Sequence, residues 1–517
     1  MLTLLMIGCN PWDMPYETTV FEEHLWDPSV AVTEEGVYVR LPTAGKLVLV
    51  KPDGTWSDVD LDGAAPETLS AAPDGSGVFV VASWSVCDDN DPLVVYVDQC
   101  ADTKLTTERE MVFVRNGERV GGGALPGVSA ALDSAAWTGD ASIAGLYLNP
   151  ANASSVVVDG FLNLNEVTFI EAQSATVHRV SVGFAAEAVL FTDDNARAVV
   201  LSRSQVAVVN LAGSDEDCDA WSSCVTYPLT LDADQTVTPD DVVLVADGRY
   251  ALVSVASSKD LYVLDLLNES IDLIELAGVP SAVVDDPDHG VTVVTYGGHA
   301  QADVIEHEFF EVSSITLEEP ATRAVLTPVG VLAYNDVTTN FKDVAMIDPV
   351  TGDWLESRAE NPIYELRAGS RFAVATMLPE SGAGGLYDAH YGLGIFALNA
   401  PSSEDTTDPV SLVLESSPVG FETLETDSAD YALLLMQDVD TLLKVRLNDA
   451  AATKIELEAP PLGIFASPGD RFVVTENSPL GMISFVDPVA DSQVTVTGFA
   501  TVAYVERPVL PRRAASE

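Results

Sequence analysis

The stretch ADGRYALVSVASSKDLYVLDL, residues 246–266, decides the fold class. It begins with an Ala-Asp-Gly turn, continues with an apolar run, turns again at Ser-Ser-Lys-Asp and ends with a second apolar run. The run DVVLV, residues 241–245, precedes it, and the more polar run SIDLIEL, residues 270–276, follows it. Short apolar runs between turn residues are typical of β-strands, so this segment predicts a unit of four strands.

The same phrase recurs along the chain. Its strongest copies begin near residues 77, 196, 248, 290, 330, 370, 430 and 470, and include GVFVVAS, ARAVVLS, GVTVVTYG, SRFAVATM, DYALLLMQD and DRFVVTEN. From residue 248 onward the starts lie about 40 residues apart, with one interval of about 60, and about 40 residues is the period of a four-stranded propeller blade. One such sheet cannot bury both of its faces alone, whereas a ring of sheets can.

The first phrase, and with it SPGDRFVVTENSPLGMISFVDP at residues 467–488, resembles the blades of WD40-like and YVTN-type β-propellers of bacterial exported proteins. The resemblance implies a fold and not a ligand. We predict an all-β protein, a β-propeller of four-stranded blades over residues 29–505 with a tail at 506–517. Counting gives seven to ten blades, and we favour one ring of about eight, in the usual range. The run TVAYVE, from residue 501, is expected to close the ring against the N-terminal unit.

The charge excludes one class of partner. Asp and Glu total 80 against 24 Lys and Arg, for a formal net charge of −56. Nucleic acids and anionic lipid surfaces are bound through Lys and Arg, so the sequence argues against both as partners. The acidic residues form short clusters between apolar runs, which is typical of solvated loops on a folded body.

The chain starts MLTLLMIGCN. The apolar run from Leu2 to Ile7, followed by Gly8 and Cys9, resembles the lipobox of bacterial lipoproteins, in which the cysteine is acylated. The resemblance implies a signal peptide at 1–8, a lipidated Cys9 with a polar tether over 9–28, and a protein of the cell envelope anchored to the outer membrane, on its periplasmic or outer side. The lipid would be its only membrane attachment. The alternative is a mistaken start followed by an ordinary buried strand.

Four further cysteines form two local pairs, Cys87 with Cys100 and Cys218 with Cys224. One unpaired cysteine at the start and two close pairs are the pattern of an exported, oxidised protein, so we predict two disulfides that close short loops. The alternative is free thiols in a cytosolic protein. Zinc is disfavoured, because the spacings are not CxxC and no histidine lies beside either pair.

Three long insertions interrupt the repeat, at residues 87–110, 214–224 and 379–392. Loops on a rigid ring commonly carry function, so we predict that these insertions recognise the ligand or partner. In the third insertion the candidate recognition residues are Tyr387, Asp388, His390 and Tyr391. His390, next to Tyr391, is the first candidate for acid or base chemistry, and its alternative is a loop histidine packed on a neighbouring tyrosine.

Calcium is the best motivated cofactor, although none is certain. Asp215, Asp217 and Asp219 alternate as in the first half of an EF-hand loop, but Ala220 and Thr226 stand where that loop needs Gly and Glu, which leaves a looser oxygen-rich site. Solvated turn residues are the alternative.

A transition metal is a second possibility, in the segment DHGVTVVTYGGHAQADVIEHE. It could be held by His299 and His307 with Glu306 or Glu308, if the strands brought these residues together. Two histidines that simply face solvent are the alternative.

Two functions stay open, because propellers host both binding modules and enzymes. The first is a monomeric binding or scaffold module whose insertions hold an envelope or extracellular protein or a glycan. The second is an exported, lactonase-like hydrolase with a carboxylate-bound divalent metal in the channel. No GxSxG, HExxH, Walker or dinucleotide-binding motif occurs in a fitting context, so the first is favoured.

Overall fold

The computed structural model describes the chain in segments. These are residues 20–21, 30–41, 44–87, 100, 104–125, 134–147, 165–172, 174, 176–203, 205–211, 219–230, 237, 239–339, 341–379, 390–399, 401, 409–437 and 439–502. Within them every named element is a β-strand, and no helix is long and apolar enough to span a membrane.

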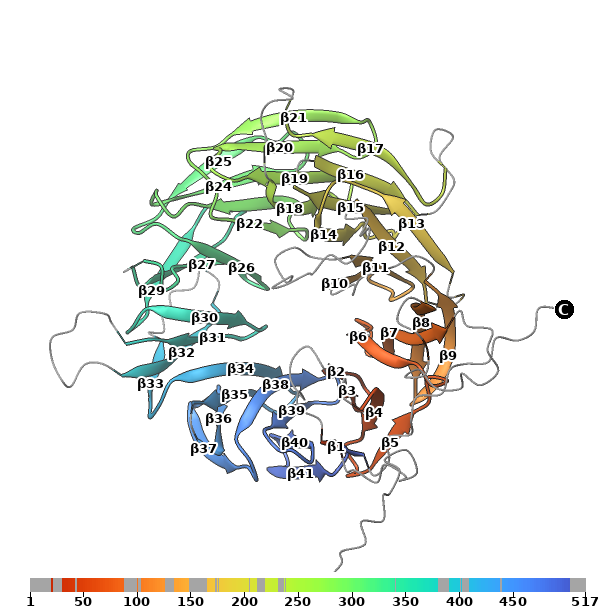
Figure 1. The fold of residues 1–517 in the computed structure, drawn as a ribbon. Helices are drawn as coiled ribbons and strands as arrows, with labels where there is room; N and C mark the ends of the chain where they lie inside the picture. The colour runs from red at the N-terminus through yellow and green to blue at the C-terminus, as the bar shows by residue number, and fades with distance from the viewer. Residues whose placement is uncertain are drawn as a thin grey trace, which may run out of the picture.

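Ten four-stranded sheets follow one another along the described chain and form the blades of a β-propeller (Figure 1). Blades 1 to 5 are β2 (Val30–Val32), β3 (Val37–Leu41), β4 (Lys46–Val50), β5 (Trp56–Val59); β6 (Ala65–Ala71), β7 (Val78–Cys87), β8 (Leu105–Arg115), β9 (Glu118–Ala124); β10 (Ser134–Trp137), β11 (Ile143–Tyr147), β12 (Glu166–Glu171), β13 (Val177–Ser181); β14 (Ala186–Phe191), β15 (Arg197–Ser202), β16 (Gln205–Asn210), β17 (Ser222–Pro228); and β18 (Pro239–Val245), β19 (Tyr250–Val255), β20 (Asp260–Asp265), β21 (Ser270–Glu275).

Blades 6 to 10 complete the ring. They are β22 (Ala282–Asp286), β23 (Val291–Thr295), β24 (Gln301–Glu306), β25 (Val312–Thr316); β26 (Arg323–Thr327), β27 (Gly330–Tyr334), β28 (Asp343–Ile347), β29 (Trp354–Arg358); β30 (Ile363–Ala368), β31 (Phe372–Met377), β32 (Tyr391–Ala397), β33 (Val410–Leu414); β34 (Pro418–Glu425), β35 (Asp430–Met436), β36 (Thr441–Arg446), β37 (Ala451–Glu456); and β38 (Pro461–Ser467), β39 (Arg471–Glu476), β40 (Met482–Asp487), β41 (Ser492–Thr497).

The predicted fold class is confirmed. The ten blades that the described residues form lie at the upper limit of the predicted range of seven to ten, and the favoured count of about eight is wrong. The count failed on two weak units, residues 36–50 and 142–149. The first supplies β3 and β4 of blade 1, and the second supplies β11 of blade 3. Both belong to blades whose remaining strands are short or weakly apolar, such as VAV and WSDV in blade 1 and SAAW in blade 3, so the signal of these blades fell below that of their neighbours.

The ring closes through hydrophobic contact between neighbouring blades. The described residues contain ten large apolar clusters, one at each interface between successive blades, including the interface that joins blade 10 to blade 1. β3 shows how a strand serves two interfaces, because Val37 and Val39 pack towards blade 10 while Tyr38 packs towards blade 2. Side chains alternate between the faces of a strand, so a strand buried on both faces needs an apolar residue at nearly every position.

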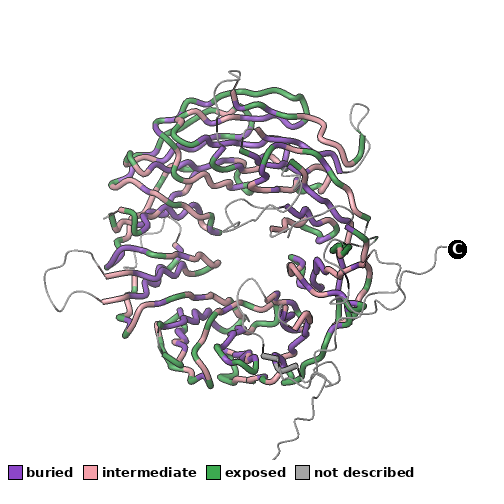
Figure 2. Tube along the Cα trace, in the orientation of Figure 1, coloured by how far each residue is buried: buried purple, intermediate pink, exposed green. Residues whose placement is uncertain are grey.

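The outermost strands differ from the middle ones, as the colouring of Figure 2 shows. β19 and β39 are almost entirely buried, whereas the fourth strand of blade 5, β21, is exposed at five of its six positions. This gradient from buried to exposed is the expected result of sheets that stand side by side around a ring.

Outside the blades, β1 (Val20–Phe21) pairs with β42 (Thr501–Val502), Val20 opposite Val502. The expected pairing of a C-terminal strand with the N-terminal part of the chain is therefore present at Thr501–Val502. It differs from the prediction in position, because the two strands form a separate two-stranded sheet and complete no blade.

The strand order gives the ring two distinct faces. Within a blade we call the strands A to D in chain order, and each pairs antiparallel with the next. The connections from A to B and from C to D therefore lie on one face, here the AB/CD face. The connections from B to C, and from each blade to the next, lie on the opposite face, here the BC/DA face.

Candidate functional site

Blade 2 carries an extension on the BC/DA face. The pairing of β6 with β7 reaches no further than Ser83. The pairing of β9 with β8 reaches no further than Glu110. β7 and β8 continue to pair beyond these points, through residues 84–87 and 105–108. We call this two-stranded extension the stapled ribbon. Both of its edges lack a further strand among the described residues.

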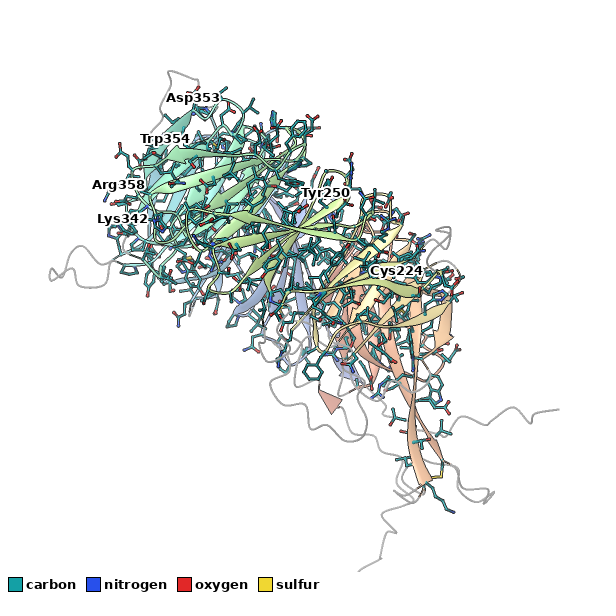
Figure 3. The ribbon with its side chains drawn as sticks, turned by 90° about the horizontal axis from the view of Figure 1, so that it is seen from above. Cys224, Tyr250, Lys342, Asp353, Trp354 and Arg358 are labelled. Carbon is teal, nitrogen blue, oxygen red and sulfur yellow. A yellow bond between two sulfur atoms is a disulfide. The ribbon has the colours of Figure 1, made fainter. Side chains whose placement is uncertain are left out.

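A disulfide closes the ribbon at its far end, where Cys87 and Cys100 are bonded with 5.9 Å between their Cα atoms. Figure 3 shows this hairpin projecting from the ring, with the disulfide at its tip. A lone two-stranded hairpin is marginally stable in water, and a covalent loop closure removes disorder from the open state. The disulfide therefore adds stability to a hairpin that extends beyond the four-stranded sheet of blade 2.

Ion pairs fix the base of the ribbon. Arg109 donates through Nε and Nη2 to the two oxygens of Glu67, at 2.6 and 3.2 Å. Arg119 donates to the two oxygens of Glu110, at 3.0 and 2.9 Å, and to Asp62 at 2.9 Å. Two-pronged guanidinium–carboxylate pairs are directional as well as strong, so they orient β8 where it leaves the blade.

A cavity of about 800 Å³ lies on the AB/CD face, over blades 5, 6 and 7. Four connections form its wall: the β18–β19, β22–β23, β24–β25 and β28–β29 turns, together with the strand ends beside them. The lining residues are Ala246, Asp247, Arg249, Tyr250, Pro287, His289, Gly290, Val291, Val304, Glu306, His307, Glu308, Glu311, Val312, Ser313, Pro349 and Val350.

His307 is the buried polar group of this cavity, with 7% of its surface exposed. Its Nε2 lies 3.1 Å from Oδ1 of Asp285 and 3.0 Å from Oγ1 of Thr292, which itself donates to Asp285. The backbone N–H of His307 donates to the carbonyl of Gly290. These contacts hold the imidazole ring in one orientation and make Nε2 its hydrogen-bond donor.

His289 stands at the exposed rim. Its Nδ1 lies 2.8 Å from Oδ2 of Asp286, and the Asp286 carboxylate is buried. This hydrogen bond and the negative charge of Asp286 raise the pKa of His289 above its usual range, and the nearby carboxylates of Asp288 and Asp348 act in the same direction. His289 therefore keeps its positive charge to a higher pH than an ordinary histidine.

Blade 5 contributes a tight turn and an aromatic ring. Ala246 and Asp247 both have a φ near +55° and precede Gly248, so three successive residues are left-handed. Arg249 lies over the Tyr250 ring, 4.8 Å from its centre, and 3.8 Å from Asp265. The other side of this region is tied to blade 6, because Tyr250 packs edge to face on Phe310 at 4.9 Å.

The predicted transition-metal site is not formed. His299 lies in the turn between β23 and β24, and His307 follows the other end of β24. A strand of this length separates its ends by roughly 20 Å, so the two histidines lie on opposite faces of the ring. His299 packs instead against Tyr296, with ring centres 6.1 Å apart.

The structure places the remaining predicted residues as follows. Cys224 is disulfide-bonded, and its predicted partner Cys218 lies outside the described residues, as do Cys9, Asp215 and Asp217. Asp219 is exposed, and its carbonyl accepts a hydrogen bond from Ser222. Within the described segments no three His, Cys, Asp or Glu side chains gather in a way that could hold a metal ion.

Of the predicted recognition loop, Tyr387 and Asp388 lie outside the described residues. His390 lies 3.7 Å from Glu360, and its carbonyl accepts a hydrogen bond from Asn361. Tyr391 begins β32 and packs against the apolar cluster between blades 8 and 9. The described half of the loop is therefore attached to the ring.

Sequence reasoning missed three features of the cavity. Asp285 is the partner of His307, and Asp247 and Tyr250 come from a neighbouring blade. The one signal available was the density of histidines and acids between residues 285 and 311. Which of them face one cavity depends on how the blades stand side by side, and that is a property of the ring.

Known proteins are only distantly similar to this chain. No protein-family model matches the chain, and no curated protein matches it in sequence. Among solved structures, the dihydro-heme d1 dehydrogenase NirN is 11% identical with a TM-score of 0.44, covering 76% of this chain and 72% of its own. A eukaryotic initiation factor is 13% identical with a TM-score of 0.45, covering 78% and 89%. AztD from Citrobacter koseri is 12% identical with a TM-score of 0.36, covering 65% and 92%. All three TM-scores are below 0.5, so these likenesses support no inference about the fold or the function of this chain.

Proposed function

We propose that the protein is a binding module of the cell envelope that holds a protein or glycan partner through the insertions of its propeller. The observation that carries this proposal is the stapled ribbon, which extends beyond the ring on one face and is closed by the Cys87–Cys100 disulfide. A rigid ring supports it from below, and ion pairs orient it at its base.

The ribbon has the chemistry of a contact surface. Its two edges carry backbone N–H and C=O groups that no strand of the described chain pairs. Thr106, Thr107 and Glu108 on β8 are exposed, and Glu108 pairs with the half-buried Trp84 across the ribbon. Unpaired strand edges and a mixture of aromatic and polar groups favour recognition of another chain or of a sugar.

The proposed address is the outer membrane, with Cys9 lipidated after removal of residues 1–8 and residues 9–28 serving as the tether. The disulfide supports export, because such bonds persist in oxidising compartments. Attachment through two or three acyl chains would be stable, whereas one chain binds only marginally. Calcium at Asp215, Asp217 and Asp219 remains part of the proposal.

Site-specific photo-crosslinking tests the binding proposal. A photoreactive residue at Thr107, in the ribbon, is expected to give one dominant adduct in intact cells, while the same residue at Val350, exposed on the opposite face, is not. The double variant Cys87→Ser/Cys100→Ser should reduce the Thr107 adduct without unfolding the ring. Identical adducts from both positions would show that the ribbon is not the interface.

The address has its own test in the intact mass of the protein isolated from its native membrane. The expected mass is that of a chain starting at an acylated Cys9, with four hydrogens gained on reduction of two disulfides. An unprocessed, unacylated chain would refute the lipoprotein proposal and leave the crosslinking result to stand alone.

A further inference from the structure

We propose that the cavity over blades 5 to 7 is a binding site for a small aliphatic polyamine, an organic molecule with two or more ammonium groups joined by methylene segments. The site lies on the AB/CD face, opposite the stapled ribbon, and does not depend on the function proposed for the ribbon. Its chemistry follows from the charges, the buried imidazole and the apolar wall.

The rim carries negative charge that the protein leaves unneutralised. Asp247, Glu306, Glu308 and Glu311 line the cavity, and no Lys, Arg or His nitrogen of the described chain forms an ion pair with any of them. The one arginine of the lining, Arg249, lies over Tyr250 and beside Asp265. Carboxylates from separate turns therefore face the same space, and a ligand with several positive charges would satisfy them together.

His307 adds a hydrogen-bond acceptor to the carboxylates of the cavity. The imidazole is more than nine-tenths buried and lines the cavity. Its Nε2 is occupied by Asp285 and Thr292, whereas its Nδ1 has no hydrogen-bond partner among the described residues. When Nε2 carries the proton, Nδ1 has a lone pair and is an acceptor. Nδ1 can therefore accept a hydrogen bond from an ammonium N–H of a ligand in the cavity.

The size and the apolar wall fit the rest of such a molecule. A cavity of about 800 Å³ lies within the range of small-molecule sites, which is roughly 300–1,000 Å³. Val291, Val304 and Pro349 line it and are buried, and Tyr250 is a further lining residue. Methylene segments can pack on this wall while the ammonium groups reach the carboxylates and His307.

Isothermal titration of the full-length protein with spermidine, in about 150 mM salt to screen the general negative surface, tests the proposal. One saturable site is expected. The double variant Glu308→Gln/Glu311→Gln should weaken binding by about tenfold, the effect of losing charge-assisted hydrogen bonds at a partly exposed site. Butylamine, with a single charge, should bind more weakly than spermidine.

The matched control is Glu456→Gln/Glu458→Gln, which removes two exposed carboxylates near blades 9 and 10 and changes the net charge equally. It should leave the affinity unchanged. Equal weakening by both double variants, or many weak sites in place of one, would overturn the proposal, because attraction to the acidic surface in general would then explain the binding.

A substitution of His307 separates the contribution of the Nδ1 acceptor from that of the rim carboxylates. In His307→Gln the amide nitrogen can reach Asp285 in place of Nε2, while the acceptor at Nδ1 is lost, so the fold should persist and spermidine should bind several-fold more weakly. Thermal unfolding of the same sample identifies a variant that fails to fold. If His307→Gln is folded and binds like the unaltered protein, the imidazole is not part of the site.

Discussion

The stapled ribbon and the cavity are built in opposite ways. The ribbon is one continuous hairpin, added to blade 2 and held by a disulfide and two ion pairs. The cavity contains no insertion, since turns of ordinary length from three blades meet around it. A feature carried by one segment is visible in the sequence as extra length, whereas a feature assembled from several segments appears only when the ring is complete.

The difference extends to stability. The apolar clusters at the interfaces of blades 5, 6 and 7 lie beneath the cavity wall, so the geometry of the cavity depends on the core. The ribbon projects away from those clusters and depends on its own bonds and on the packing of Trp84 against the cluster between blades 1 and 2. Damage to the core should therefore affect the cavity, and damage to the ribbon should remain local.

Ile305→Ala is expected to have the largest effect. Ile305 is fully buried between blades 5 and 6, directly before the rim residue Glu306. Truncation of a buried isoleucine lowers the free energy of unfolding by about 2–5 kcal/mol, and denaturant unfolding measures it. Ile271→Ala, at an exposed position on β21, is the control and should cost far less. Equal losses of unfolding free energy in Ile305→Ala and Ile271→Ala would show that the cavity is not supported by the core.

Arg109→Met should have an intermediate, local effect. It removes the two hydrogen bonds to Glu67, whose side chain is mostly buried, and an unpaired carboxylate of this kind costs about 1–3 kcal/mol. Proteolysis between β7 and β8 should become faster, while spermidine binding at the cavity stays the same. Arg203→Met, which breaks the more exposed pair with Glu187, serves as the control. A loss of spermidine binding in Arg109→Met would contradict the independence of the two regions.

A rise in pH should lower the stability of the ring through Glu356 on β29 of blade 7. Burial, with the neighbouring Asp343 and Glu318 carboxylates, raises the pKa of Glu356 to about 8. The unfolded chain releases this proton at a lower pH than the folded one, so stability falls as pH rises from the ordinary range of a glutamate to about 8. Glu356→Gln has no carboxyl proton to release, so this pH-dependent loss of stability should disappear.

The melting temperature of Glu356→Gln should exceed that of the unaltered protein by about 1–2 °C at pH 9, and by less at pH 5. Asp353→Asn, an exposed position on the same blade, changes the charge equally and controls for general repulsion. The same gain in both variants would assign the effect to net charge.

His289 should produce the smallest effect. Its raised pKa, caused by Asp286 with Asp288 and Asp348 nearby, means that it carries positive charge in mildly acidic solution and loses it as pH rises. A cation at the rim repels a polyamine, so spermidine affinity should increase by about threefold between pH 5.5 and 8.5. His289→Gln should flatten this dependence; a slope that survives the substitution would have to come from another group.

The sequence predicted those parts of the molecule that depend on local pattern. Runs such as RAVVLS and RFVVTE are apolar at successive positions because both faces of a middle strand are buried, and they identified the propeller. Cys87 and Cys100 were paired correctly because they flank a single loop.

Other parts depend on relations that no local pattern contains. Blade 3 has short strands with Ala and Gly at several positions, SAAW and IAGLY, and the predicted number of blades was therefore too low. The cavity joins Asp247 to Glu308, which come from different blades. Their meeting is set by the packing of β18–β21 against β22–β25, so the sequence offered only a concentration of acids and histidines.

Each blade of this ring is a single uninterrupted segment, and the ring closes through side-chain packing between blades 1 and 10 while β1 and β42 pair outside them. During synthesis, nine of the ten interfaces can form in order as the chain emerges, and only the last must wait for the final blade. Since β1 and β42 lie side by side, joining the chain there and opening it between any two other blades would leave every blade whole. Such circular permutants should reach the same ring, with a different interface closing last.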